Sequence, residues 1–441
     1  ASVSVAAGDL VYPMCTTLPM GWSHSVYIAQ CVHEHVLYNI TRVLSPSHNI
    51  MNLTSPLVSC EVVHAVYIDD LGAMSTDLAR HQRVHAAIID AYASVGLPVK
   101  LSKVVAPVSL RRTSMELLGV SFGYDEHSQQ YAMSVTPAKL LSLMQLTVTV
   151  LLSGRATALE MAALVGHWAW LILARRPAFA VLSHVYRFAI VAGQRRFDIW
   201  PSVRRELVQL LAVAPLLRTS LSALFNRRLV ATDASTHGGG VVTTQLTPTL
   251  RSALWPVAVA KHGQADLLDD EAGPSDAVER PSGVAGAATG PGRLASQQPS
   301  VAHRPCWSGP VPLYELVGRH PFNTIISTRW RHSEHINKLE LRALLLCLQW
   351  MMTLRDSCHT RLLCLIDNTV AFYSVRKGRA SSPNLMPLIR KINATLLAAH
   401  ITLMPVWIPS EFNPADKPSR QSDPSPLSFL AHLHHVRVGR L

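Results

Sequence analysis

An apolar segment that ends in two adjacent aspartates, VVHAVYIDDLG at 62–72, constrains the fold of this chain more than any other feature. Its β-branched and aromatic residues predict a buried strand, and the DDLG that ends it predicts the turn that reverses the chain. A helix is then expected to start near Ser75 or Thr76 and to stop at Gly96. Its apolar face would consist of Leu78, Val84, Ile88, Ala91, Tyr92 and Val95.

The paired carboxylates of Asp69 and Asp70 would therefore lie on a hairpin tip beside a packed helix. Two carboxylates ~4 Å apart repel by about 4 kcal/mol at an effective dielectric near 20. One explanation for the pair is an ordinary turn, since aspartate favours turns. The other is a divalent cation between them, which would keep both carboxylates ionised.

The length and charge of the chain limit its class. With 441 residues, of which 49% are hydrophobic, it is expected to form about two or three domains with real cores. The net charge of +12 favours a polyanionic partner, either nucleic acid or an anionic membrane surface. The longest apolar stretches, at 140–152 and 161–174, are shorter than the ~20 residues of a membrane span, so we interpret both as buried helices.

Seven cysteines without a CxxC pair indicate neither a disulfide framework nor a zinc ribbon. The first residues, ASVSVAAGDL, do not resemble a signal peptide and suggest a piece of a longer chain. We expect an intracellular protein, cytoplasmic or nuclear, with no membrane contact.

The composition changes most sharply at 262–310, which is rich in Gly, Pro, Ala and Ser and has almost no large apolar residue. Such a segment cannot bury enough surface to offset its ordering entropy, so we expect a disordered insertion. Helical patterns dominate before it, and strand and helix patterns alternate after it. The expected division is 1–135, a helical and basic region 136–226, a domain at 227–420 that contains the insertion, and a tail at 421–441.

The stretch from 171 to 230 holds ten arginines against two acidic residues. Guanidinium groups grip phosphate oxygens through parallel hydrogen bonds, so these side chains suit a nucleic-acid backbone. The alternative is a solvated basic face. The arginines are Arg175, Arg176, Arg187, Arg195, Arg196, Arg204, Arg205, Arg218, Arg227 and Arg228.

The aspartate pair has neighbours that together resemble the palm of reverse transcriptases. The family signature is aliphatic-Tyr-aliphatic-Asp-Asp on a hairpin. Four further segments follow the family order: LPMGWSHS at 18–25, GLPVKLSK at 96–103, ELLGVSF at 116–122 and TALEMAALVGHWAWLILARR at 157–176. In that order, they resemble the segment that lines the incoming nucleotide and template, the next family motif, which contains a lysine, the primer-grip hairpin, and the thumb and connection region.

This resemblance implies roles for individual residues. Asp69 would be a metal ligand and Asp70 its partner, with two Mg²⁺ or Mn²⁺ ions per site, and Lys103 would donate a proton to the leaving pyrophosphate. Trp22 would contact nucleic acid. The family also needs an earlier palm aspartate, but only the short stretch 1–17 precedes the LPMG segment. We therefore expect an incomplete palm that does not polymerise DNA without an upstream polymerase segment.

Four carboxylates downstream occupy distinct settings. Asp233 lies inside a strand, Glu340 in an early helical turn, Asp367 at the end of a buried strand and Asp416 after a loop. Each has a structural alternative. Asp233 could cap a turn, Glu340 could complete a capping box with Asn337, Asp367 could cap the next helix, and NPAD could be ordinary loop chemistry.

Together these residues resemble the RNase H domain of retroelements of the DIRS or gypsy-like group, which follows the polymerase directly. The motifs are ATDAS, HINKLEL, LIDNTVA and NPADKPSR. The resemblance implies that Asp233, Glu340, Asp367 and Asp416 bind two Mg²⁺ or Mn²⁺ ions and cleave the RNA strand of an RNA–DNA hybrid. The hybrid would be recognised through its minor groove and 2′-hydroxyls.

The expected fold is thus α/β and α+β multidomain, a partial palm and thumb followed by an RNase H-like mixed sheet with flanking helices. Asp233 and Glu340 are farther apart in the sequence than a compact RNase H needs. Removing 262–310 would bring their spacing near the family's, so the insertion should be dispensable. Two alternatives to the nuclease remain: a non-catalytic nucleic-acid-binding remnant, and a reverse transcriptase completed by residues upstream.

Overall fold

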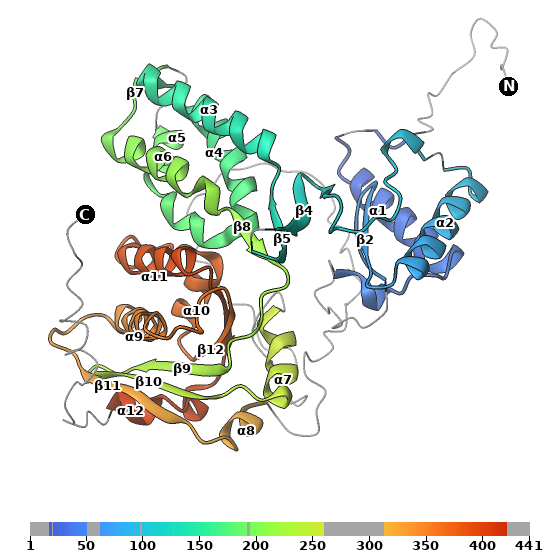
Figure 1. The fold of residues 1–441 in the computed structure, drawn as a ribbon. Helices are drawn as coiled ribbons and strands as arrows, with labels where there is room; N and C mark the ends of the chain where they lie inside the picture. The colour runs from blue at the N-terminus through green and yellow to red at the C-terminus, as the bar shows by residue number, and fades with distance from the viewer. Residues whose placement is uncertain are drawn as a thin grey trace, which may run out of the picture. The chain divides into compact units, whose positions relative to one another are not determined.

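A computed structural model describes residues 17–19, 21–50, 62–97, 99–126, 128–191, 195–259 and 313–420 (Figure 1). The expected insertion at 262–310 and tail at 421–441 lie outside these residues. The chain divides into two compact units, one of residues 1–175 and 183–223, the other of 176–182 and 224–441. Within the described residues, every helix is too short or too polar to cross a bilayer. The expected mixed α and β architecture with more than one domain is confirmed.

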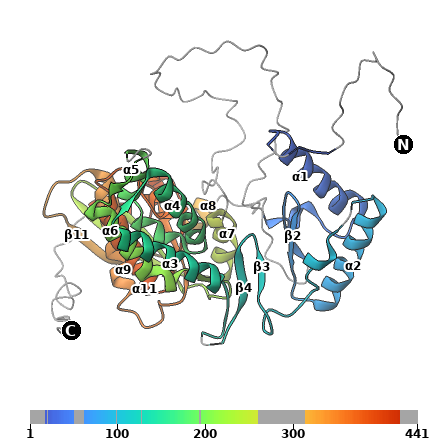
Figure 2. The same ribbon diagram turned by 90° about the horizontal axis from the view of Figure 1, so that it is seen from above.

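The first unit begins with a hairpin covered by helices. Strands β1 (Val63–Tyr67) and β2 (Asp70–Met74) pair antiparallel, with Tyr67 opposite Asp70. Helices α1 (Ser25–His35) and α2 (Leu78–Ser94) lie against the hairpin (Figure 2). Helix α2 begins later than expected because Asp77 is its N-cap and accepts a hydrogen bond from the Arg80 amide at 3.0 Å. The core here consists of Leu37, Leu44, Val62, Val66, Val84 and Ile88.

A four-stranded antiparallel sheet follows, in the order β3-β4-β5-β8. Its strands are β3 (Met115–Leu117), β4 (Val120–Asp125), β5 (Gln130–Val135) and β8 (Arg218–Ser220). Between β5 and β8 the chain forms the helices α3 (Pro137–Ser153), α4 (Ala158–Ile172), α5 (His184–Val191) and α6 (Pro201–Val213). A short ribbon of β6 (Arg155–Ala156) and β7 (Phe197–Asp198) joins two of their connections.

The two apolar stretches that we interpreted as buried helices form α3 and α4, but α3 is buried along one face only, because Leu146 and Leu152 are 47% and 82% exposed. Trp168 of α4 is fully buried, and its Nε1 donates to Thr147 Oγ1 of α3 at 2.9 Å. Thr157 and Glu160 form a capping box that starts α4. Shorter helical segments occur at Val36–Ile40, Pro46–His48, Leu101–Lys103, Leu173–Val181, Ala214–Leu216 and Ser410–Phe412.

The second unit is built on a mixed five-stranded sheet, in the order β11-β10-β9-β12-β13. Strands β9, β10 and β11 are antiparallel neighbours, whereas β12 runs parallel to both β9 and β13. The strands are β9 (Arg228–Ala234), β10 (Gly238–Gln245), β11 (Asn323–Arg329), β12 (Arg361–Ile366) and β13 (Thr402–Trp407). The helices are α7 (Pro248–Val259), α8 (Leu313–Gly318), α9 (Ile336–Met351), α10 (Thr369–Lys377), α11 (Met386–Ala398) and α12 (Asp416–Arg420).

Helices cover both faces of this sheet, as Figure 1 shows. Side chains of α9, α10 and α11 pack on one face with Val230, Leu362 and Cys364, and those of α7 and α8 pack on the other with Leu229 and Leu363. A strand buried on both faces needs apolar residues in succession, which is why RLLCLI of β12 does not alternate. The centre of the sheet is therefore dry, and polar groups there need partners.

Candidate active site

Asp233 lies near the end of β9, the central strand of the second unit's sheet. It is 4% exposed and pairs in register with Gly240 of β10. Strand β12 runs parallel to β9, with Cys364 level with Val230. Continuing this register places Asp367, the residue after β12, level with Asp233. The carboxyl ends of parallel strands meet at one edge of a sheet, so the two aspartates are brought together by backbone pairing.

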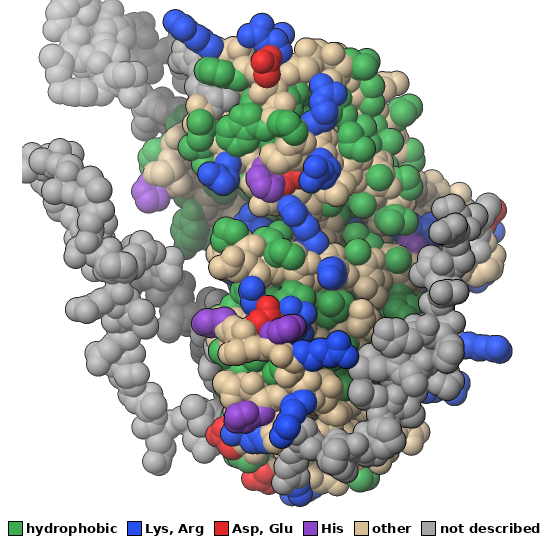
Figure 3. All heavy atoms as spheres, turned by 90° about the vertical axis from the view of Figure 1, so that its left-hand side faces the viewer, with side chains coloured by type: hydrophobic (Ala, Val, Ile, Leu, Met, Phe, Trp, Pro, Cys, Tyr) green, Lys and Arg blue, Asp and Glu red, His purple; other side chains and the backbone are tan. Residues whose placement is uncertain are grey.

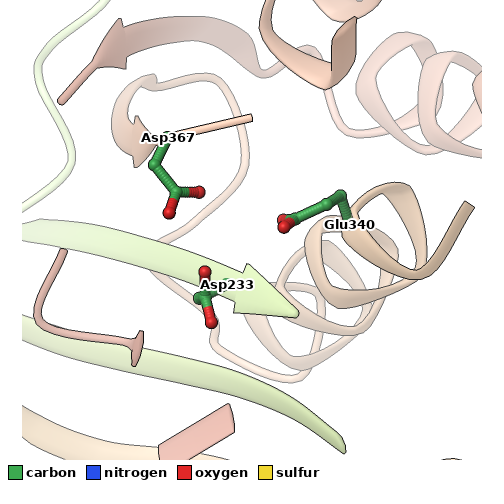
Figure 4. Close-up of side chains that lie close together, drawn as sticks. All are labelled: Asp233, Glu340 and Asp367. Atoms are coloured by element: carbon green, nitrogen blue, oxygen red, sulfur yellow. The ribbon is translucent and has the colours of Figure 1, made fainter. Parts of the chain in front are cut away.

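Glu340 comes from α9, which packs on β9, and it is 5% exposed. The Ala234 backbone hydrogen-bonds its carboxylate. The capping-box alternative for Glu340 is wrong, because His335 is the N-cap of α9 and accepts from the Asn337 amide. The side chain of Glu340 is therefore directed at the end of β9 (Figure 4).

The N-cap alternative for Asp367 is also wrong. Asn368 caps α10, with its Oδ1 accepting from the Ala371 amide at 2.9 Å. Asp367 is instead held through its backbone, whose carbonyl accepts a 2.7 Å hydrogen bond from Trp407 Nε1. Its carboxylate faces Asp233 and Glu340 (Figure 4).

Each of these three residues offers a carboxylate oxygen, and the three oxygens lie within 4.8 Å of one another. At that separation two unit charges repel by about 3–4 kcal/mol at an effective dielectric near 20. Within this group of residues, the oxygens Glu340 Oε2 and Asp367 Oδ1 are buried without a hydrogen-bond partner. A buried acceptor without a donor is costly, and a cation would remove that cost.

Burial and the neighbouring charges raise the pKa of two of these carboxylates, those of Glu340 and Asp233. Burial, followed by the charges of Asp367 and Asp233, raises the pKa of Glu340 to about 9. Burial is also the main cause that raises the pKa of Asp233 to about 7, with Asp367 and Asp416 adding to it. Oxygen ligands without nitrogen or sulfur suit hard cations such as Mg²⁺ and Mn²⁺, so the donor set fits the expected metals.

The fourth expected ligand, Asp416, is the first residue of α12 and stands beside this group without joining it. Its Oδ1 accepts a 2.8 Å hydrogen bond from Arg420 Nε and forms an ion pair with Arg420 Nη2, also at 2.8 Å. It is close enough to raise the pKa of Asp233. Three of the four predicted carboxylates are thus brought together, and the fourth is paired with an arginine at their edge.

Residues that the sequence reasoning missed hold this edge in place. Asn413 is 5% exposed, and its Nδ2 donates to the Thr232 carbonyl of β9 at 3.0 Å. Ser419 is 1% exposed, and its side chain hydrogen-bonds Asp233. A usable signal was the run of glycines at 238–240 in β10, because glycine inside a strand indicates close approach of another backbone.

The Asp69–Asp70 pair lies at the tip of the first unit's hairpin, and both side chains are exposed. Ile68 precedes them with a left-handed φ of 55°. Its amide donates to Gln30 Oε1 and its carbonyl contacts His33 Nδ1, both at 2.7 Å, so α1 holds the turn. In the described part of the chain, Asp69 and Asp70 belong to no group of three or more potential metal ligands.

The remaining expected polymerase residues lie on the surface. Lys103 ends a short helical turn and is exposed. Trp22 is 47% exposed, and its ring stands edge-on to that of His24.

The predicted phosphate-binding arginines divide into exposed and buried ones. Arg176, Arg195 and Arg196 are exposed, although Arg196 is paired with Glu160. Arg175 is 4% exposed, so in this conformation its guanidinium is not available to a phosphate. Figure 3 shows Lys and Arg side chains scattered over one face of the molecule, without a continuous basic patch. The alternative of a solvated basic face therefore stays open.

No protein-family model matches the chain, and no curated protein sequence matches it either. Three solved structures of the foamy viral protease-reverse transcriptase are similar to it. The complex with an RNA/DNA hybrid is 13% identical, has a TM-score of 0.34 and covers 92% of this chain and 62% of its own. The complex with double-stranded DNA is 12% identical and has a TM-score of 0.33, and the match covers 88% of this chain and 59% of the viral chain. The dRH form with double-stranded DNA is 13% identical and has a TM-score of 0.35, and the match covers 88% of this chain and 50% of the viral chain. The chain thus spans less than two thirds of these proteins.

Proposed function

We propose that the second unit is an RNase H-type endoribonuclease that hydrolyses the RNA strand of RNA–DNA hybrids, as part of a retroelement reverse transcriptase. The observation that carries the proposal is the group of Asp233, Glu340 and Asp367, whose carboxylate oxygens lie within 4.8 Å of one another. Asp233 and Glu340 are buried, Asp367 is half-buried, and the group holds two oxygens without a hydrogen-bond partner. The motifs around these residues, in family order, support the substrate class.

The three carboxylates would hold divalent ions, which supply Lewis acidity and lower the pKa of a bound water. Asp233 and Asp367 come from adjacent parallel strands and Glu340 from the helix that covers them, so the ligands are set by rigid elements. Asp416 would complete the group after partial release from Arg420. Burial of Asp233 and Glu340 would strengthen their electrostatic contacts with the ions.

Residues outside the acidic group would bind the nucleic acid. We propose that Trp22 and the exposed arginines Arg176, Arg195 and Arg196 contact the substrate, with phosphate contacts fixing position and not sequence. We propose no polymerase activity for this chain alone. Asp69 and Asp70 would need a third ligand, and none lies with them in the described ranges.

A cleavage assay with a labelled RNA–DNA hybrid tests the nuclease. The wild type should cut the RNA strand in Mg²⁺ or Mn²⁺ but not in EDTA, and should leave double-stranded DNA intact. Asp367→Asn and Glu340→Gln keep the side-chain size and remove charge, so each should lower the rate by about 100-fold or more.

The matched control is Asp356→Asn, an exposed carboxylate of the same unit that pairs with Arg228, and it should cleave like the wild type. If the wild type binds the hybrid without cutting it, the non-catalytic alternative is correct. Equal cutting by Asp367→Asn and the wild type would place the activity elsewhere.

A further inference from the structure

Helix α12, which carries Asp416, lies directly on the backbone of β10 at two glycines. A Cβ atom on Gly240 would lie 2.5 Å from the Ala415 carbonyl oxygen and 2.9 Å from the Ser419 nitrogen. A Cβ on Gly238 would lie 2.4 Å from the Thr328 carbonyl oxygen and 2.9 Å from the Ser419 carbonyl oxygen. These atoms belong to the backbone, so a side chain could fit only if that backbone moved away.

Hydroxyl groups connect the same helix to two strands, β9 and β11. Ser235, just after β9, donates from its Oγ to the Ser419 carbonyl at 2.8 Å. Ser327 of β11 donates to the Pro418 carbonyl at 2.7 Å. Ser419 Oγ donates to the Asp416 carbonyl at 2.8 Å, and the Ser419 side chain also hydrogen-bonds Asp233. The short helix is thus held by its backbone against the end of β9.

We propose that Gly238, Gly240 and Ser419 are positioning residues, which set the distance of the fourth carboxylate, Asp416, from the other three. Ordinary van der Waals contact begins at 3.4 Å, so an alanine at 240 would displace Ala415 by about 1 Å. Asp416 is the next residue and would move with it. This proposal rests on the proposed nuclease function, because its consequence is weaker binding of divalent metal.

The Mg²⁺ dependence of hybrid cleavage by the full chain tests the proposal, and calorimetric titration of Mg²⁺ into the full chain without substrate gives a second readout that does not depend on activity. Gly240→Ala should raise the Mg²⁺ concentration for half-maximal rate by about tenfold, the usual size of effect for residues behind metal ligands. The matched control is Gly318→Ala at the end of α8, where a Cβ meets nothing within 4 Å, and its Mg²⁺ dependence should be that of the wild type.

A double-mutant cycle separates positioning from simple loss of stability. If Gly240 acts through Asp416, then Gly240→Ala should raise the Mg²⁺ concentration for half-maximal rate when Asp416 is present. In the Asp416→Asn background, Gly240→Ala should cause no further increase. A purely structural effect would instead lower the rate by the same factor in both backgrounds, and that result would overturn the proposal.

Ser419→Ala adds no bulk and serves if Gly240→Ala does not fold. It removes the hydroxyl that joins Asp416 and Asp233, so it should raise the Mg²⁺ midpoint several-fold relative to the wild type. An unchanged midpoint in Ser419→Ala, with an active wild type, would refute the positioning role alone. An inactive wild type would refute the nuclease itself.

Discussion

Glu340 and Asp233 carry protons in the cation-free protein that they would release when cations bind. Burial raises the pKa of Glu340 from 4.5 to about 9 and that of Asp233 from 3.8 to about 7. Both pKa values are higher in the folded than in the unfolded protein. The protonated groups therefore contribute their full stabilisation only when the pH is below the pKa values of the unfolded chain, 4.5 and 3.8. This contribution is lost as the pH rises through about 7 and about 9.

We therefore expect the free energy of unfolding of the metal-free protein to fall as the pH rises from about 4 to about 9. Thermal or urea denaturation in EDTA across this range measures the effect. Glu340→Gln keeps a neutral side chain at every pH, so its stability should depend less on pH. Saturating Mg²⁺ should restore stability at high pH. Parallel pH profiles for the variant and the wild type would contradict this account.

Single residues were predictable where their local setting defines them. The neighbouring residues predicted that Asp233 lies inside a strand, Glu340 on an early helical turn and Asp367 at a strand end, whereas their grouping was predicted only from the resemblance to RNase H. The pairing of Asp416 with Arg420 was not, although one helical turn separates them, because a loop motif does not show that a helix begins at Asp416. Ser419 was missed because its partner Asp233 is distant in sequence.

At the scale of elements, a buried glutamate joins two helices of the first unit. Glu206 of α6 is 2% exposed and accepts hydrogen bonds from three successive backbone amides at the start of α5, those of Ser183, His184 and Val185, at 2.9–3.1 Å. Its Oε1 also contacts His184 Nδ1 at 2.8 Å. One carboxylate from a neighbouring helix thus satisfies the unpaired amides that begin α5.

We expect Glu206→Gln to lower the free energy of unfolding by about 2–4 kcal/mol, because its amide group would face backbone donors that need an acceptor. Urea denaturation followed by circular dichroism measures the loss. Arg205→Gln, at the neighbouring exposed position of α6, should change stability by less than about 0.5 kcal/mol. A similar loss in both variants would show that α6 and not the capping carboxylate is responsible.

Helices and strands were predictable from the sequence where the pattern of apolar residues indicates one of them clearly. The apolar run of β12 and the periodic face of α9 predicted a buried strand and a helix, and both are present. The register of β12 against β9 was not predictable, because a strand buried on both faces has no polar side that marks its alignment. The closeness of Asp233 and Asp367 depends on that register.

At the scale of the whole molecule, α7 and α8 flank the segment between Val259 and Leu313 and belong to one core. Leu250, Leu254 and Val257 of α7 pack in the same cluster as Leu313 and Val317 of α8. The two helices also contact each other directly. The native arrangement therefore keeps the two ends of this segment near each other.

We expect replacement of 262–310 by a short Gly-Ser linker to leave the melting temperature within a few degrees of the wild type and to preserve hybrid cleavage. Differential scanning calorimetry and the cleavage assay measure the two quantities. A deletion variant that also lacks 313–318 loses Leu313 and Val317 from the core and should be clearly less stable. Loss of folding on removal of 262–310 alone would show that this segment contributes to the core.

The sheet order has a consequence for synthesis of the chain. Strand β9 is made first but lies at the centre, between β10 and β12, and Asp367 is made long after Asp233, once β10, β11 and α9 have been translated. A nascent chain still in the ribosome therefore holds no complete set of the three carboxylates until the segment through Asp367 has left the exit tunnel. Any metal binding that needs all three carboxylates would thus begin only after that point in synthesis.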